Sequence, residues 1–214
     1  MAVLTFDQGR LARQLALLPA KHRVAFAAAC SERLIPNYEA FALMERWGDS
    51  SALDRALDAA WGYLDDTPLP ETLVRELIAA SEAVAPDTEE FDSLFTSAAL
   101  DAAGAVIATL MCCLNGEVSE AVRAASAARD TIDMYIQQDE VLDATNPNFE
   151  QRILAHPLMI EELSRQQQDM ERLRTVGVFS ATFLTDLRRT SRSAGLQPIT
   201  RGLMPPAGDN IGQA

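Results

Sequence analysis

Apolar residues recur at intervals of three and four along most of the chain, which is the spacing of one face of an α-helix. The pattern predicts a short helix over residues 6–18 and a second over 20–35, where Pro36 breaks or kinks the chain. Helical spacing resumes from Tyr38 and stops at Gly48. Further helices are expected over residues 53–64, 73–84, 94–114 and 119–142. No strand-like alternation persists, so the pattern predicts an all-α protein.

Two of the predicted helices shape the expected architecture. Residues 94–114 carry a face of small side chains, so this helix is expected to lie buried at the centre. Residues 158–194 hold a heptad-like seam at 4-3-4-3 spacing, formed by Met159, Leu163, Gln166, Met170, Leu173, Gly177, Ser180, Leu184 and Leu187. A continuous helix of that length must wrap the domain, bend near Gly177 or project into a partner.

The expected fold is therefore a single-domain helical bundle of about seven helices over residues 1–196, with a buried central helix and a long C-terminal helix. Residues 197–214 are rich in Gly and Pro and are expected to form a flexible tail. The composition is typical of a globular helical protein, because 48% of the 214 residues are hydrophobic and only 6% are aromatic.

Charge and targeting signals narrow the possible partners and location. The net charge is −13, with the acidic excess in residues 1–150, which argues against a nucleic-acid partner. The apolar run 98–114 contains Asp101 and many small residues, which favours a buried helix over a membrane span. Residues 1–18 lack the features of a signal peptide. Three cysteines without a leader indicate a reducing, cytoplasmic location.

The sequence supplies no recognised metal or nucleophile motif. His22 and His156 lie 134 positions apart, and Cys112 and Cys113 are adjacent, so zinc-ligand spacing is lacking. His22 and Cys30 are about two helical turns apart, too far for a catalytic pair. We therefore expect no metal and no cofactor, and we expect all three cysteines to pack in the core.

Candidate functional residues gather where the helical pattern is interrupted, between Cys30 and Asp49. Polar and aromatic side chains converge on this bend: Glu32, Asn37, Tyr38, Trp47 and Asp49. A structural interpretation, with Asn37 or Asp49 capping a helix and the aromatics packing, is favoured over a functional one.

Three further sets of charged residues need an interpretation. Asp101 lies in an apolar helix and must find a partner, either a structural hydrogen bond or a ligand that it serves as a functional acid. Arg188, Arg189 and Arg192 are interpreted as a solvated helix face. The acid pairs Asp54/Asp58 and Asp130/Asp133 are interpreted in the same way.

Residues 22–64 resemble the corresponding part of the YjaG-like bacterial proteins, known as domain of unknown function 416. The most specific stretch covers residues 32–41 and reads ERLIPNYEAF, with looser similarity over 99–110 and 187–195. The resemblance implies a single all-helical bacterial domain and assigns no activity. The chain departs from the family after the last matching segment, where it ends in PITRGLMPPAGDNIGQA.

Two functional hypotheses follow. The first is a noncatalytic cytoplasmic protein that acts through protein–protein contacts, as a homodimer held by the seam of the last helix. The alternative is a small-molecule or metal-dependent enzyme, with a pocket between the Pro36 bend and the Asp101 helix.

Overall fold

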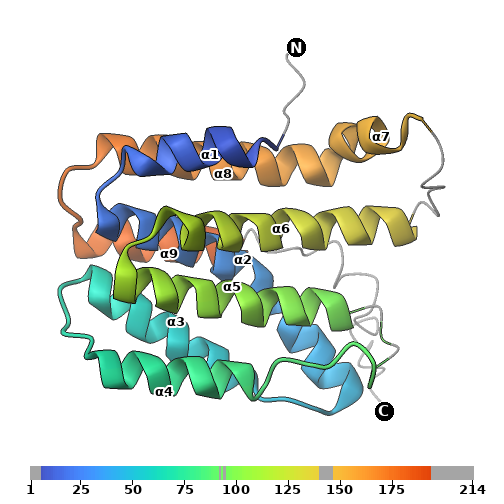
Figure 1. The fold of residues 1–214 in the computed structure, drawn as a ribbon, viewed down its shortest axis with the longest axis horizontal. Coiled ribbons are helices and arrows are strands. Elements are labelled where there is room, and N and C mark those ends of the chain that lie inside the picture. Colours follow the sequence, from blue (N-terminus) through green and yellow to red (C-terminus); the bar gives the residue numbers. More distant parts are fainter. Residues whose placement is uncertain (1–5, 92, 94, 140–146, 194–214) are drawn as a thin grey trace, which may run out of the picture.

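The computed structural model describes residues 6–91, 93, 95–139 and 147–193. Within these ranges the chain forms nine α-helices, contains no strand and makes a single body (Figure 1). The helices are α1 (Gln8–Ala16), α2 (Ala20–Glu45), α3 (Ser50–Leu64), α4 (Glu71–Glu82), α5 (Thr96–Asn115), α6 (Val118–Asp139), α7 (Phe149–Ala155), α8 (Pro157–Thr175) and α9 (Ala181–Ser193). The predicted tail 197–214 and the end of the helix expected over 119–142 lie outside the described residues.

The helix that organises the bundle is α2 rather than the helix expected at the centre. It contacts α3, α5, α6, α8 and α9, and most of its residues from Val24 to Phe41 are buried. Helix α5 packs closely against it, with Ala102 and Ala105 fully buried on the predicted small-residue face. In Figure 1, α1 and α8 lie along one side of these central helices, and α3 and α4 along the other.

The sequence predicted a break or a kink at Pro36, and the break is wrong, because α2 continues through the proline to Glu45. Proline cannot donate to the carbonyl four residues earlier, so the helix loses one hydrogen bond there. The surrounding helices compensate, since burial of residues on every side of α2 stabilises its helical conformation beyond local propensity. The helix ends instead at Arg46 and Gly48, both of which have positive φ angles.

The predicted long C-terminal helix is divided. Helix α8 ends at Thr175, Val176 adopts an extended conformation, and α9 begins at Ala181. Seven of the nine seam positions are buried against the chain's own core, the exceptions being Gly177 and Ser180. The seam is therefore an intramolecular packing surface, and it is not exposed to a second copy.

Helix α5 has the length and apolar content that a membrane span requires. It nevertheless contacts α2, α3, α4 and α6 inside the bundle. The buried core helix of a helical bundle has the same length and apolar content.

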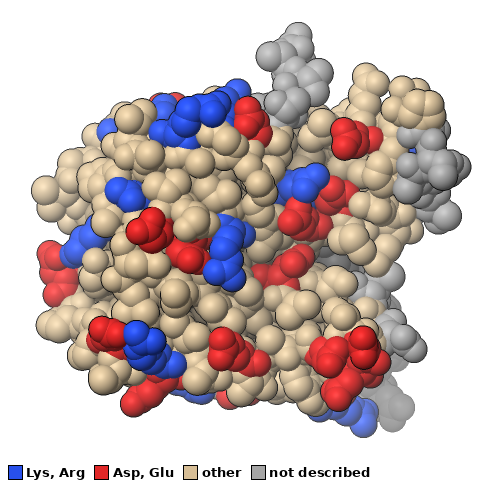
Figure 2. Space-filling view, viewed as in Figure 1, with Lys and Arg blue, Asp and Glu red and all other residues tan. Residues whose placement is uncertain are grey.

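On the face shown in Figure 2, acidic and basic side chains are interspersed.

Candidate functional site

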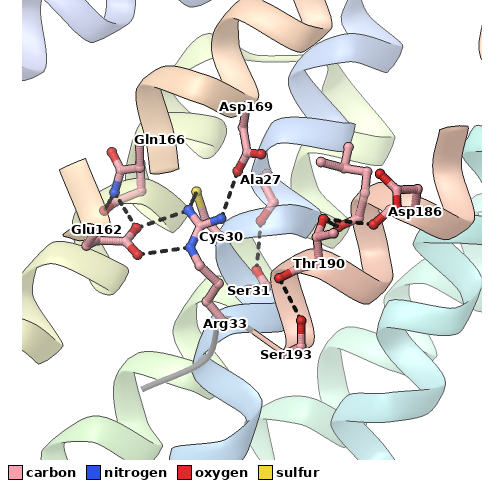
Figure 3. A network of polar contacts seen from close by, with 12 residues as sticks. Ala27, Cys30, Ser31, Arg33, Glu162, Gln166, Asp169, Asp186, Thr190 and Ser193 are labelled. Atoms are coloured by element: carbon pink, nitrogen blue, oxygen red, sulfur yellow. Dashed lines mark hydrogen bonds and ion pairs between the residues drawn. The ribbon is translucent and has the colours of Figure 1, made fainter. Parts of the chain in front are cut away.

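The guanidinium of Arg33 is enclosed in the middle of α2 and binds two carboxylates from α8. Its Nε and Nη2 atoms donate to the two oxygens of Glu162 at 2.9 and 3.0 Å, and Nη1 donates to Asp169 Oδ2 at 2.8 Å. Nη2 also donates to Cys30 Sγ at 3.2 Å, and Gln166 donates to Glu162 at 2.8 Å. Figure 3 shows these side chains converging. We call these five residues the Arg33 cluster.

The Arg33 cluster contains one cation and two carboxyl groups. Burial alone would lower the pKa of the Arg33 guanidinium, but Glu162, Cys30 and Asp169 together outweigh this effect and raise it. Burial raises the pKa of Asp169, and the nearby Arg33 only partly offsets it. Burial also raises the pKa of the Cys30 thiol to about 12, so this thiol remains protonated at neutral pH. The cluster is a buried ion-pair centre and holds no activated nucleophile.

The residue before Arg33 points elsewhere and anchors α9. Glu32 is fully buried, and its Oε1 accepts from Trp61 Nε1 at 2.9 Å and from Arg188 Nε at 2.8 Å. Its Oε2 accepts from Arg192 Nε at 2.6 Å. Because neighbouring helical residues point about 100° apart, Glu32 reaches α3 and α9 while Arg33 reaches α8. We call Glu32, Trp61, Arg188 and Arg192 the Glu32 cluster.

Three acids extend the Glu32 cluster toward the surface. Arg188 donates to Asp58 at 2.6 Å, and Arg192 donates to Glu39 at 3.2 Å and to Asp54. Burial raises the pKa of Glu39 despite Arg192 beside it. Each arginine therefore bridges a buried carboxylate and a more exposed one, and α9 is fixed to both α2 and α3.

The interpretation of three arginines as a solvated face is wrong for two of them. Arg188 and Arg192 lie one turn apart on the side of α9 that faces Glu32, and about two thirds of each side chain is covered. Arg189, in contrast, is exposed and pairs with Asp186 at 2.7 Å. The acids Asp54 and Asp58 pair with Arg192 and Arg188 while their side chains stay 37% and 62% exposed.

A cavity of about 260 Å³ opens between α2, α8 and α9. The described residues that line it all have polar or charged side chains, whose aliphatic parts also form part of the wall: Arg33, Arg165, Gln168, Asp169, Arg172, Thr190 and Ser191. Three of them, Arg33, Asp169 and Ser191, are buried, whereas Arg165 and Arg172 are partly exposed. We call this space the α8–α9 cavity.

Helix α8 brings its lining residues to one side through their spacing, since positions 165, 168, 169 and 172 fall on one helical face. Arg172 is oriented further by Asp186, which accepts from it at 2.8 Å, and by the ring of Phe183, whose centroid lies 5.3 Å from the guanidinium carbon. The cavity thus combines a buried carboxyl group with arginines held at its edge.

Among the predicted site residues, Glu32 and Asn37 are close in sequence to Arg33, which lines the α8–α9 cavity. Asn37 is fully buried one turn beyond Arg33 on α2, and neither its Oδ1 nor its Nδ2 has a hydrogen-bond partner among the described residues. A buried amide in this state costs free energy unless water reaches it. The structure does not connect Asn37 to the α8–α9 cavity.

The other residues of the predicted bend have structural roles. Tyr38 is buried and donates to the carbonyl of Val84 at 2.6 Å, so it ties α2 to the end of α4. Trp47 packs against Phe91, with ring centroids 5.2 Å apart. Asp49 caps α3 by accepting from a backbone amide in its first turn at 3.0 Å.

Asp101 faces α6, away from the Glu32 cluster. Thr131 donates to its Oδ2 at 2.8 Å, which is the kind of structural hydrogen bond expected for it. Burial, with a smaller effect of Asp130, raises the pKa of Asp101 to about 6. Because Glu32 bonds to α3 and α9, these two candidate acids do not share one site. Within the described ranges, no three His, Cys, Asp or Glu residues are grouped so as to hold a metal ion.

The sequence-based argument missed Arg33, Glu162, Asp169 and most of the cavity lining. The sequence contains one indication of these buried ion pairs: Glu32 and Arg33 are the sole charged residues in the segment 24–35, which is otherwise almost entirely apolar. Adjacent charges in a helix that is apolar all round must both be paired inside the protein. Their partners on α8 and α9 lie more than 120 positions away and carry no recognisable motif.

Comparison with known proteins identifies the fold and the family. The crystal structure of a DUF416 family protein from Shewanella baltica OS155 superposes with a TM-score of 0.77 at 22% identity, covering 86% of this chain and 94% of that one. At this identity the likeness shows the fold alone. No curated protein matches the sequence. The family described as protein of unknown function (DUF416) matches residues 10–199, which is most of the sequence. The chain belongs to the DUF416 family.

Proposed function

We propose that the protein is a noncatalytic binding protein that holds a small charged metabolite in the α8–α9 cavity. The observation that supports this proposal is the set of polar and charged side chains that line the cavity, with three arginines in a chain of net charge −13. Binding pockets for drug-sized ligands are mostly apolar and occupy about 300–1,000 Å³. A smaller cavity with a polar wall suits a compact, charged ligand.

The chemistry of the wall favours binding over catalysis. Arginine guanidiniums stay protonated at physiological pH, so they hold anions but do not exchange protons. The Cys30 thiol behind Arg33 keeps its proton as well, because burial raises its pKa to about 12. Cys30, Cys112 and Cys113 are all free thiols, which suits the reducing conditions of the cytoplasm.

The partner that we propose differs from the second copy suggested by the C-terminal seam. Met159, Leu173 and Leu187 of that seam are fully or almost fully buried inside one chain. Using them in a dimer would require the chain to open. The small-molecule reading needs no such change, because the α8–α9 cavity is already open to solvent at the partly exposed Arg165 and Arg172.

Native mass spectrometry of untagged protein from its own host tests the proposal. We expect a mass excess that disappears on denaturation and is lost in the variant Arg172→Gln. Arg174→Gln is the matched control, because Arg174 lies on the same helix with similar exposure but does not line the cavity. A protein that carries no excess mass and whose Tm is unmoved by a library of charged metabolites would refute the proposal.

A further inference from the structure

The inner wall of the α8–α9 cavity presents two oxygens that lack a donor. Asp169 uses Oδ2 to accept from Arg33, but no described residue donates to its Oδ1. Ser191 is only 4% exposed, and its hydroxyl makes no hydrogen bond within the part of the chain that the structure describes. Both residues line the cavity. Neither oxygen is among the fully enclosed atoms without a partner, so both are reached from the cavity and are available to a ligand.

The charge of the inner wall favours a cationic donor at this place. Arg33 is shared between Glu162 and Asp169, which leaves one carboxylate without a full counter-charge. Burial is the main cause of the raised pKa of Asp169, and the attraction of Arg33, with a smaller one from Arg172, offsets it only in part. A ligand ammonium group, with three donors, would neutralise the excess charge and satisfy both oxygens.

The outer part of the cavity favours the opposite charge. Arg165 and Arg172 point their guanidiniums from one face of α8, and each pairs with an acid that is half exposed, Glu161 and Asp186 respectively. Ion pairs at the surface contribute little free energy, so a ligand anion can compete for these arginines or join them. Carboxylates and phosphates match the planar fork of arginine.

We infer that the α8–α9 cavity binds a small zwitterion, with its ammonium group at Asp169 and Ser191 and its acidic group at Arg165 and Arg172. The inference rests on the proposed function and names its ligand class. The volume of about 260 Å³ limits the ligand to roughly the size of an amino acid or a short amino phosphate.

Isothermal titration calorimetry of the whole chain with matched probes tests the ligand class. The probes are L-α-amino acids of increasing size, the corresponding carboxylates without the amine, and the corresponding amines without the carboxylate. We expect at least one amino acid to bind, and removal of either charged group to weaken binding about tenfold or more, because each charge-assisted hydrogen bond is lost.

Two variants locate the two ends of the ligand. Asp169→Asn is expected to weaken the zwitterion about tenfold or more while leaving the fold intact, since it removes the excess buried charge. Arg172→Gln is expected to lower the affinity for the zwitterion by a similar factor, and Arg174→Gln is expected to leave that affinity unchanged. Circular dichroism melts of each variant establish that the fold is retained before the binding data are compared.

The outcomes separate the two proposals. If a carboxylate without an amine binds as tightly as the amino acid, or if Asp169→Asn leaves the affinity unchanged, the zwitterion inference is overturned while the binding function stands. If no probe binds and native mass spectrometry shows no bound mass, both are overturned. A zwitterion that binds equally well to Arg172→Gln and to the native protein also refutes the inferred site.

Discussion

Removing the cation from the Arg33 cluster is expected to destabilise the protein severely. Arg33→Met keeps the length and apolar stem of the side chain but leaves Glu162 and Asp169 facing each other without their shared counter-charge. The two acid side chains are only 6% and 10% exposed, so water entering from the α8–α9 cavity replaces the guanidinium only in part. Breaking a buried ion pair from one side costs about 3–5 kcal/mol. The free energy of unfolding of a native domain is about 5–15 kcal/mol, so this loss would remove a large share of the protein's stability.

Urea unfolding followed by circular dichroism measures the loss. At pH 7 the midpoint of Arg33→Met should fall, and the melting temperature should drop by roughly 6–20 °C, since each kcal/mol shifts Tm by about 2–4 °C in a domain of this size. The deficit should shrink as the pH is lowered, because the stranded carboxyl groups can take up protons and lose their charge.

Two further proteins make the result specific. Arg75→Met is the control, since Arg75 pairs with Glu71 on the exposed face of α4 and its loss should cost less than about 1 kcal/mol. The triple variant Arg33→Met/Glu162→Gln/Asp169→Asn removes all three charges and should recover at least half of the loss. The reasoning fails if Arg33→Met costs no more than Arg75→Met, or if the triple variant is no more stable than the single one.

Three other substitutions, with Gly104→Ala as a control for one of them, test individual contacts in urea unfolding. Burial raises the pKa of Asp101 to about 6 from 3.8, so this group lowers stability as pH rises through that window. Asp101→Asn should remove this contribution to the pH dependence and stabilise the protein at pH 8 by up to about 3 kcal/mol; an unchanged pH profile would contradict this. Asn37→Leu should stabilise by about 1–2 kcal/mol by removing an unpaired amide, and a loss would instead reveal a bound water. Gly48→Ala should cost about 2–3 kcal/mol, because φ is +84° and a Cβ would overlap the Tyr38 hydroxyl. Gly104→Ala, where the space is open, should be neutral or stabilising; equal losses in both glycine variants would refute the clash.

Much of the fold could be predicted from the sequence, because a helix that buries one face must repeat its apolar residues every three or four positions. The helix expected over 94–114 is α5, and its end at Asn115 is set by Gly116 in the left-handed conformation. The prediction failed at Pro36, where packing on all sides outweighs a local preference. A bend near Gly177 was one of the alternatives left open, and the helix is interrupted there between α8 and α9, with the seam spacing intact on both sides.

The candidate site was only partly predictable, since it depends on contacts between distant segments. Glu32 was singled out as part of a bend, but its partners Arg188 and Arg192 lie 156 and 160 positions away. Helical spacing shows that those two arginines share a face, but it does not show whether that face meets solvent or a buried acid. The cavity lining is assembled from three helices, so no local pattern records it.

The two charged clusters explain why a polar cavity exists at this point of an apolar bundle. Glu32 and Arg33 are adjacent on α2, yet one binds α9 and the other binds α8. Helix α9 follows α8 after a five-residue connection. Because both helices are bound to α2, one through Arg33 and the other through Glu32, the two ion-pair clusters fix the position of α8 relative to α9. Ser191 of α9 lies just before Arg192, and Asp169 of α8 binds Arg33 directly, so each cluster fixes one wall of the cavity. A change in either ion-pair cluster should therefore alter ligand binding as well as stability, whereas a change in the Tyr38–Val84 contact should alter stability alone.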